Sequence, residues 1–167
     1  MDRSSLDLIQ PSITTREKPH ALATSERYSK AAAEVIYRST RFVDALNSRE
    51  FRKFIQMVGP EHIAGTFTAY LDNQALAFTW PEFVSTLHEA AKVDPDYRVS
   101  IIDQSVDLDD VAGHAVVFMF IEVTGRPATI KREDALVFEW QRQDGVWKCY
   151  GHTAIRGSSA IPLNQPG

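Results

Sequence analysis

Four long segments with the composition of β-strands fill the second half of the chain, and their short connections restrict the fold more than any other feature. The segments are Tyr97 to Leu108, Ala115 to Thr124, Ala128 to Arg142 and Val146 to Arg156. Turns that contain glycine separate them, and the last turn, Asp144-Gly145, is a strong signal for a two-residue hairpin. Consecutive hairpins predict a long, curved, antiparallel sheet.

The first half of the chain is predicted to begin with two helices. Apolar residues recur at three- and four-residue spacing after Thr24 or Ser25 and end at Leu46, which predicts the first helix. Asn47 is predicted to cap a short second helix, because Glu50 follows three residues later, as in a capping box.

A predicted strand, Phe67 to Leu71, separates the second helix from the third. Thr79 is expected to cap the third helix, with Glu82 reaching back toward the cap. This helix stops before Asp94-Pro95, because a residue that precedes proline disfavours helical geometry. Helices followed by a meander predict an α+β fold in which the helices cover one face of the sheet.

The composition narrows the class of protein. The 167 residues fit one domain, 44% of them are hydrophobic, and the formal net charge is −4 with no block of like charge. This balance predicts no nucleic-acid partner and no membrane partner, and a single cysteine excludes a disulfide framework and a zinc site built from cysteines. The longest apolar run, Ala115 to Ile121, is too short to cross a bilayer, so we expect a cytoplasmic protein.

The two ends of the chain have the composition of tails. Residues 1–23 show no sustained periodicity, and residues 158–167 contain Pro162 and Pro166. We therefore expect a flexible N-terminal tail, a single domain over residues 24–157 and a C-terminal tail.

The order of the predicted elements resembles the nuclear transport factor 2-like (NTF2-like) superfamily, which includes ketosteroid isomerase, scytalone dehydratase and the SnoaL-like polyketide cyclases. The resemblance covers about Thr24 to Gly157 and is most specific at Asp44 to Phe51 and at Asp144 to Lys148, which look like scytalone dehydratase. It implies a cone-shaped α+β barrel, in which three N-terminal helices pack on a strongly curved antiparallel sheet.

The catalytic residues of scytalone dehydratase are mostly replaced in this sequence. In an ungapped comparison, the dehydratase's first tyrosine and its aspartate fall on Leu46 and Asn47. One of its two histidines falls on Ile101 and the other on Ile121 or Glu122. Its serine and its asparagine fall on Asp134 and Leu136. Only its second tyrosine has a match, at Tyr70. The resemblance therefore predicts the fold but a different reaction.

Strand alternation supplies the candidate pocket residues. Pairing through the last hairpin places Leu136 on the face under the helices, and by period two Asp134 points inward at the far end of the sheet. Asp103 shares its parity with Ile101 and is also expected to look inward. Asp134, Asp103 and Tyr70 would then share an apolar chamber. The expected substrate contacts are Trp80, Met119, Ile121, Leu136, Ile101 and Asn47.

Each candidate also has a structural interpretation that the sequence leaves open. In this interpretation Asp134 pairs with Lys131 or Arg132 at a strand end exposed to solvent. Asp103 likewise faces water. Tyr70 and Trp80 would be core aromatics. A catalytic Asp134 predicts that Asp134→Asn leaves stability unchanged or raises it, whereas a solvated pair predicts a change below ~0.5 kcal/mol.

His152 has two possible orientations. Strict alternation places it on the outer face, whereas a β-bulge at Gly151 would turn it into the chamber, where it would meet Asp134 as an acid–base pair. No His-x-His or His-x-x-x-His spacing occurs, so no metal is expected. Glycine-rich phosphate loops are also missing, so no nucleotide cofactor is expected.

These features predict a cofactor-independent lyase or isomerase, of dehydratase or cyclase type. It would act by proton transfer on a small, apolar, carbonyl-bearing metabolite such as a polyketide or terpenoid intermediate. Burial raises the pKa of a carboxyl and suits it to proton transfer, while a tyrosine hydroxyl stabilises an enolate. The alternative is a non-catalytic module that binds a small ligand or a protein. A titratable group in a dry pocket favours the enzyme, and a chamber filled by side chains favours the module.

The outer face of the predicted sheet carries an apolar patch. Alternation places Phe118, Phe120, Val137 and Tyr150 away from the helices. A contiguous patch of this kind predicts a homodimer that forms through the outer face.

Overall fold

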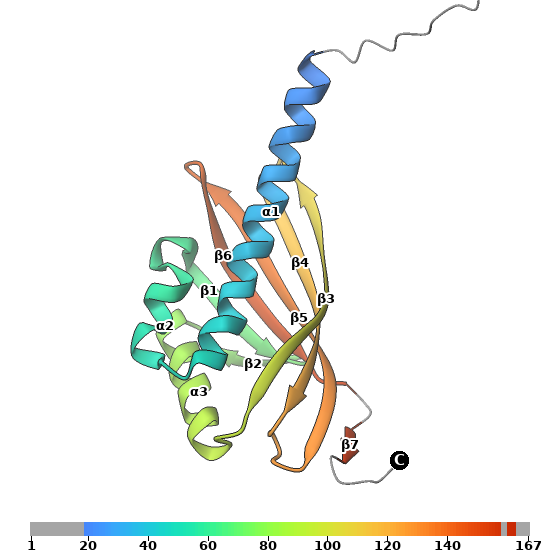
Figure 1. The fold of residues 1–167 in the computed structure, drawn as a ribbon. Helices are drawn as coiled ribbons and strands as arrows, with labels where there is room; N and C mark the ends of the chain where they lie inside the picture. Colours follow the sequence, from blue (N-terminus) through green and yellow to red (C-terminus); the bar gives the residue numbers. More distant parts are fainter. Residues whose placement is uncertain (1–18, 158–159, 163–167) are drawn as a thin grey trace, which may run out of the picture.

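The computed structural model describes residues 19–157 and 160–162, and its element order is shown in Figure 1. The helices are α1 (Pro19–Ser48), α2 (Phe51–Val58), the 3-10 turn η1 (Pro60–His62) and α3 (Trp80–Val93). The strands are β1 (Ile63–Leu71), β2 (Gln74–Ala77), β3 (Arg98–Asp109), β4 (His114–Thr124), β5 (Ile130–Gln143), β6 (Val146–Ile155) and β7 (Ala160–Pro162).

The predicted ends of the domain need adjustment. Helix α1 begins at Pro19, so it includes the last residues of the expected N-terminal tail, and residues 1–18 lie outside the described residues. Strand β7, within the expected C-terminal tail, pairs with β5 through Lys131 and Ile161.

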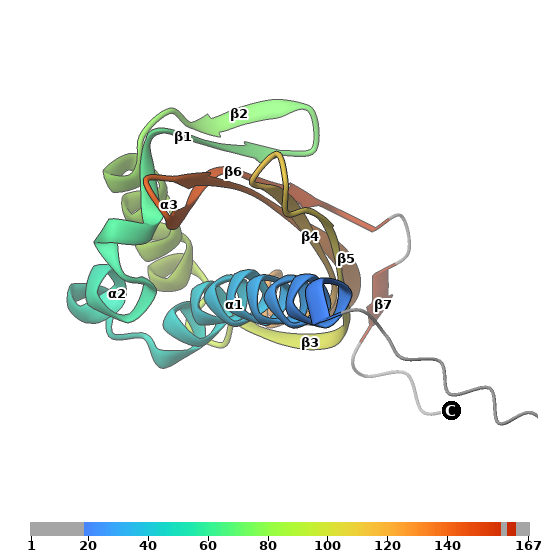
Figure 2. The same ribbon diagram turned by 90° about the horizontal axis from the view of Figure 1, so that it is seen from above.

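The sheet has the strand order β2-β1-β6-β5-β4-β3, with β7 beside β5 off this path. The three hairpins that join β3 to β6 are antiparallel, as predicted, but β1 pairs with β6 in parallel. The α+β class and the curved sheet are confirmed, whereas the expected antiparallel pairing does not hold for β1 and β6. Because β2 and β3 are the two edges, the sheet stays open (Figure 2).

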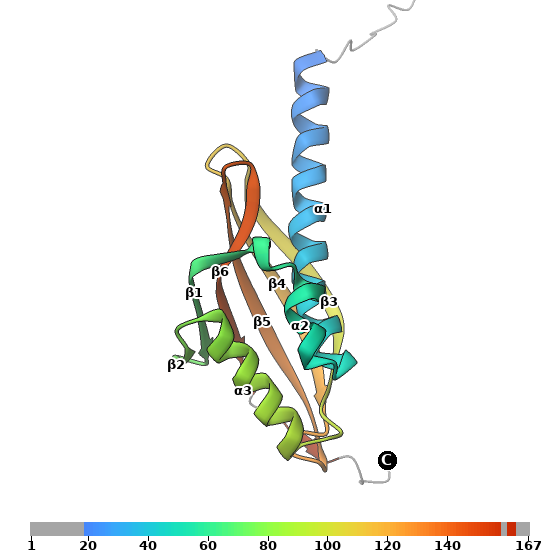
Figure 3. The same ribbon diagram turned by 90° about the vertical axis from the view of Figure 1, so that its left-hand side faces the viewer.

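The helices lie on the concave side of the sheet (Figures 2 and 3). Helix α1 runs within the curve, and its buried Ser39 hydroxyl accepts a 2.9 Å hydrogen bond from the indole N–H of Trp140 on β5. Helix α3 starts as predicted: the Thr79 hydroxyl accepts from the backbone N–H of Glu82, and the Glu82 carboxylate accepts from the N–H of Phe78. The Ser39 contact joins α1 to the sheet, and the capping contacts fix the start of α3.

Asn47 does not cap α2. Its side-chain amide donates to the carbonyl of Val99 at 2.7 Å and accepts from the N–H of Val99 at 3.0 Å. The Ser48 hydroxyl instead accepts from the N–H of Glu50. Asn47 therefore joins the end of α1 to the edge strand β3, and the expectation that it contacts substrate is wrong.

Two β-bulges change which residues face the helices. In β3, Ile101 pairs with Ile121 but the next pair is Asp103 with Phe120, so Ile102 is the extra residue. In β6, the register shifts between the Cys149 pair and the Gly151 pair, so Tyr150 is extra. A bulge reverses the alternation beyond it, and both bulges lie within the candidate pocket strands.

Candidate functional site

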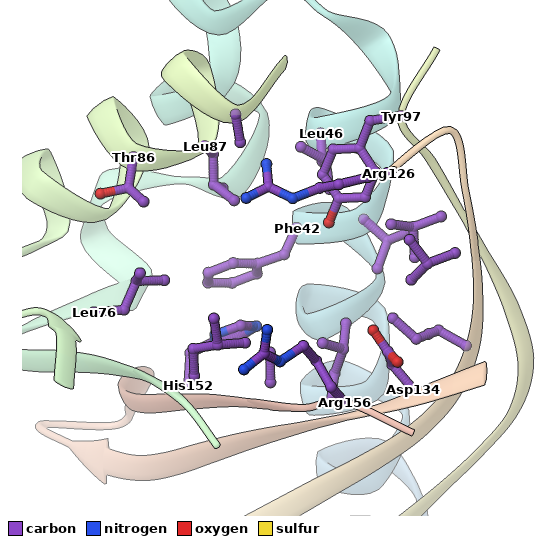
Figure 4. Close-up of a pocket in the computed structure, with 18 of the residues that line it drawn as sticks. Phe42, Leu46, Leu76, Thr86, Leu87, Tyr97, Arg126, Asp134, His152 and Arg156 are labelled. Atoms are coloured by element: carbon purple, nitrogen blue, oxygen red, sulfur yellow. The ribbon is translucent and has the colours of Figure 1, made fainter. Parts of the chain in front are cut away.

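A cavity of about 390 Å³ lies between the concave face of the sheet and helices α1 and α3 (Figure 4). Its volume is within the range of about 300–1,000 Å³ typical of small-molecule sites. Most of its wall is apolar and includes Phe42 and Leu46 of α1, Phe83 and Leu87 of α3, and Leu136 of β5. The cavity is therefore suited to bind a molecule with an apolar surface.

His152 is one of the polar residues that line this cavity. The bulge at Tyr150 places it opposite Phe138 and under the helices, and its exposed fraction is 7%. Its ring lies against three phenylalanine rings, with centroid distances of 6.5 Å to Phe42, 5.0 Å to Phe83 and 4.8 Å to Phe138. Of the two orientations that the sequence leaves open, the structure has the inward one.

The imidazole of His152 is electrically neutral at neutral pH. Burial lowers its pKa to about 4, because an apolar surrounding disfavours the charged form. Its Nδ1 atom is buried and has no hydrogen-bond partner among the described residues. His152 therefore lines the cavity with a ring nitrogen that no described residue engages.

Asp134 also lines the cavity, but its carboxylate is fully engaged. The guanidinium of Arg132 donates two hydrogen bonds to it, at 2.6 Å and 2.8 Å, and the backbone N–H of Gly157 donates a third at 2.9 Å. The same contact raises the pKa of Arg132. The expected Asp134–His152 pair does not form, because Arg132 is the partner of this carboxylate.

Tyr97 and Arg126 form the side of the cavity away from His152 (Figure 4). The Tyr97 hydroxyl points into the cavity, and burial raises the pKa of this phenol, so it stays protonated as a hydrogen-bond donor. The guanidinium of Arg126, from the turn between β4 and β5, lies 5.5 Å from the centre of the Tyr97 ring.

The sequence analysis did not identify Tyr97 or Arg126 as cavity residues. Tyr97 shares its parity with Val99 and Ile101, so strand alternation carried a signal for it. Arg126 lies in a turn, where alternation does not apply, and no sequence signal distinguishes it from other turn arginines.

The remaining predicted acid–base residues lie outside the cavity. Asp103 is exposed, because the extra residue Ile102 rotates it to the outer face beside Phe120. Tyr70 is 37% exposed, and it is Leu71, the next residue of β1, that lines the cavity. The inward orientation expected for both is therefore wrong.

The predicted substrate contacts divide between cavity and core. Ile121 and Leu136 line the cavity, whereas Met119 is wholly buried and Ile101 packs against the core. Trp80 does not roof the cavity mouth. Its buried indole packs in an aromatic cluster, 5.3 Å from the ring of Phe42 and 5.3 Å from that of Phe67.

Two further searches cover the described residues. Within residues 19–157 and 160–162, no group of three or more His, Cys, Asp or Glu side chains is placed to hold a metal ion. In the same part of the chain, no helix is long and apolar enough to cross a membrane.

No protein-family model and no curated protein matches the sequence. Solved structures do share its fold. An NTF2-like protein with a cystatin-like fold from Novosphingobium aromaticivorans is 14% identical, with a TM-score of 0.67 over 90% of this chain and 99% of that chain.

Two other similar structures carry functional descriptions. A candidate dehydratase from the NTF2-like family of Streptomyces avermitilis is 13% identical, with a TM-score of 0.62 over 78% of this chain and 99% of that chain. A candidate ketosteroid isomerase from Shewanella frigidimarina is 12% identical, with a TM-score of 0.55 over 71% of this chain and 91% of that chain. Identities this low establish the fold alone: the chain has the NTF2-like fold, as the order of its elements predicted.

Proposed function

We propose that the protein is a cofactor-independent isomerase or lyase that moves a proton on a small, apolar, carbonyl-bearing molecule. The observation that carries this proposal is His152, a neutral imidazole without a hydrogen-bond partner for Nδ1, inside an apolar cavity. The similar structures described as a candidate dehydratase and a candidate ketosteroid isomerase support the same class of reaction.

His152 is the residue that takes the proton. Because its pKa is about 4, the imidazole is unprotonated at neutral pH and always available as an acceptor. A base this weak removes a proton from the carbon next to a carbonyl only if the enolate that forms is stabilised. The imidazolium and the enolate form as neighbouring opposite charges, and their attraction is strong in an apolar cavity.

Tyr97 is the donor that stabilises the developing enolate oxygen. Its hydroxyl points into the cavity and stays protonated. A fixed donor aimed at the position where negative charge develops lowers the barrier without reorganisation. Tyr97 thus takes the role that the sequence assigned to Tyr70.

A non-catalytic binding module is the second candidate, and one observation favours it. The carboxylate of Asp134 is paired with Arg132 and Gly157, and in the described part of the chain it makes no hydrogen bond to His152 that could relay a proton. A binding protein needs no relay, and His152 and Tyr97 would then serve only as hydrogen-bond partners for the ligand.

Exchange of carbon-bound hydrogen in deuterated water separates the two functions. We would follow the hydrogens next to the carbonyl by proton NMR in a panel of cyclic and aryl ketones, each tested with and without a carboxylate substituent. Wild-type protein should accelerate exchange in at least one ketone, and His152→Gln should lower that rate by about 10²-fold or more.

The matched control is His88→Gln, since His88 lies outside the cavity against Phe51. It should exchange at the wild-type rate, and melting curves should show all three proteins folded. If no ketone exchanges, or if His152→Gln exchanges as fast as wild type, the enzyme proposal fails and the binding module remains.

A further inference from the structure

Three arginines line the cavity, and two of them are neutralised by protein carboxylates. Arg132 is held by Asp134 through two hydrogen bonds. Arg156 is held by Asp72, which accepts from Nε at 3.0 Å and from Nη2 at 2.8 Å. Both guanidinium groups therefore already donate to a protein carboxylate.

Arg126 differs from both. Its nearest acidic group is Asp94, with 3.9 Å between Nε and Oδ2, well beyond the ~2.7–2.9 Å of a charge-assisted hydrogen bond. Its Nη1 atom is buried and has no hydrogen-bond partner among the described residues. The side chain as a whole is 41% exposed, so it is this one buried N–H that lacks a partner and that an added acceptor would satisfy.

The position of Arg126 is fixed by its neighbours. Gly125 has a φ of +74°, and a Cβ atom there would overlap the backbone of Asp96. The turn between β4 and β5 therefore packs directly on the start of β3. This contact holds the Arg126 guanidinium over the Tyr97 ring, next to the phenol hydroxyl that points into the cavity (Figure 4). Two donors of fixed position thus share one side of the cavity.

We propose that the natural ligand carries a carboxylate, which binds between the Arg126 guanidinium and the Tyr97 hydroxyl while its apolar body lies toward His152. This inference rests on the proposed function, since it concerns the same cavity, and it narrows the substrate class to apolar carboxylic acids. A singly charged group fits better than a phosphate, because Asp94 lines this cavity beside Arg126 and repels a second negative charge.

Paired ligands test the inference by calorimetry at pH 7. The panel consists of straight-chain and phenyl-substituted carboxylates, each matched with its primary amide, which keeps the shape and removes the charge. At least one acid should bind wild-type protein tenfold or more tightly than its amide. Arg126→Gln should weaken the binding of that acid by about tenfold or more and leave the affinity for the amide unchanged.

Two further variants serve as controls. Arg52→Gln removes the same charge from an exposed position on α2 and should bind both ligands as wild type does. Arg126→Lys should keep part of the preference for the acid, because it keeps the charge but loses the planar fork. Melting curves establish that each variant is folded, and if Arg126→Gln does not fold, the comparison of Arg126→Lys with wild type decides.

The inference is overturned if no acid binds more tightly than its amide, or if the preference survives in Arg126→Gln. Its failure is distinct from failure of the proposed catalysis. His152→Gln should keep the preference for the acid, so a protein that binds acids selectively but exchanges no carbon-bound hydrogen would refute the catalysis and leave the carboxylate site in place.

Discussion

His152 lies in an unusual setting for a histidine, among the rings of Phe42, Phe83 and Phe138. Keeping an imidazole there requires that it stay uncharged. The cost of charging it links the stability of the whole protein to pH.

We expect His152 to make the protein less stable as the pH falls from about 6.5 to about 4. In this window the unfolded chain binds a proton at His152 and the folded chain does not, so unfolding takes up a proton and acid favours it. Below the folded pKa of about 4, the full loss is about 3 kcal/mol. Denaturant titrations at several pH values would measure it.

The control for this pH dependence is His152→Gln, which carries the other titratable groups unchanged. The difference between wild-type and variant free energies of unfolding should vary with pH only in this window. A difference that stays constant from pH 7 to pH 4 would contradict the buried, neutral imidazole.

Asp134→Asn should lower the free energy of unfolding by about 2–3 kcal/mol, as expected when one partner is removed from a largely buried ion pair. The loss follows because Arg132, whose side chain is 18% exposed, keeps its charge without its carboxylate. A double-mutant cycle with Arg132→Gln would measure the coupling by thermal or denaturant unfolding. Unchanged or increased stability in Asp134→Asn would restore the catalytic interpretation of Asp134.

Much of the fold was predictable from the sequence, but the identity of the cavity residues was predictable only in part. Hairpin turns and apolar spacing are local signals, so they located the helices and the meander. Side-chain direction depends on every bulge along a strand, and the bulge at Ile102 sent Asp103 outward while the bulge at Tyr150 brought His152 inward. The glycine beside Tyr150 gave a signal for its bulge, whereas the β3 bulge had none.

At the scale of elements, the contact between α1 and β3 depends on one side chain. An edge strand presents unpaired backbone groups, and Asn47 satisfies both the N–H and the carbonyl of Val99. Asn47 was predictable as a polar residue at a helix end, but its partner lies 52 positions away in the sequence and no local rule finds it.

We expect Asn47→Ala to lower the free energy of unfolding by about 1–3 kcal/mol, because two backbone groups of Val99 lose their partners. Hydrogen exchange at the amide of Val99 should accelerate in the variant, while that of Val117, in the middle of β4, should change only as much as global stability does. Equal exchange at Val99 in the two proteins would show that Asn47 does not hold this edge.

At the scale of the whole molecule, the outer face of the sheet exposes three large apolar side chains. Phe118 is 44% exposed, Phe120 61% and Ile155 46%. They form a continuous surface, because Phe120 and Ile155 both pair with Ala135 on β5. A self-complementary patch of this kind suits a two-fold contact.

We propose a homodimer through this face and expect light scattering at micromolar concentration to give twice the chain mass of 18.8 kDa. Phe120→Glu should give a monomer, because it places a charge in the buried contact. Phe78→Glu is the matched control: Phe78 is 67% exposed, precedes α3 and should leave the dimer intact. A wild-type protein that scatters as a monomer would refute the proposal.

The central place of β6 in the sheet has a consequence for how the chain acquires its structure. Strand β6 lies between β1 and β5, although it is the last long strand to leave the ribosome. Until it is made, the β1–β2 hairpin and the β3–β5 meander are two unjoined pieces, and the free edge of β5 is open to pairing with other chains. Joining them requires contacts as distant as that of Ile63 with Cys149, which slows folding. His152 lies on the same strand, so the cavity is completed only after β6 has joined the sheet.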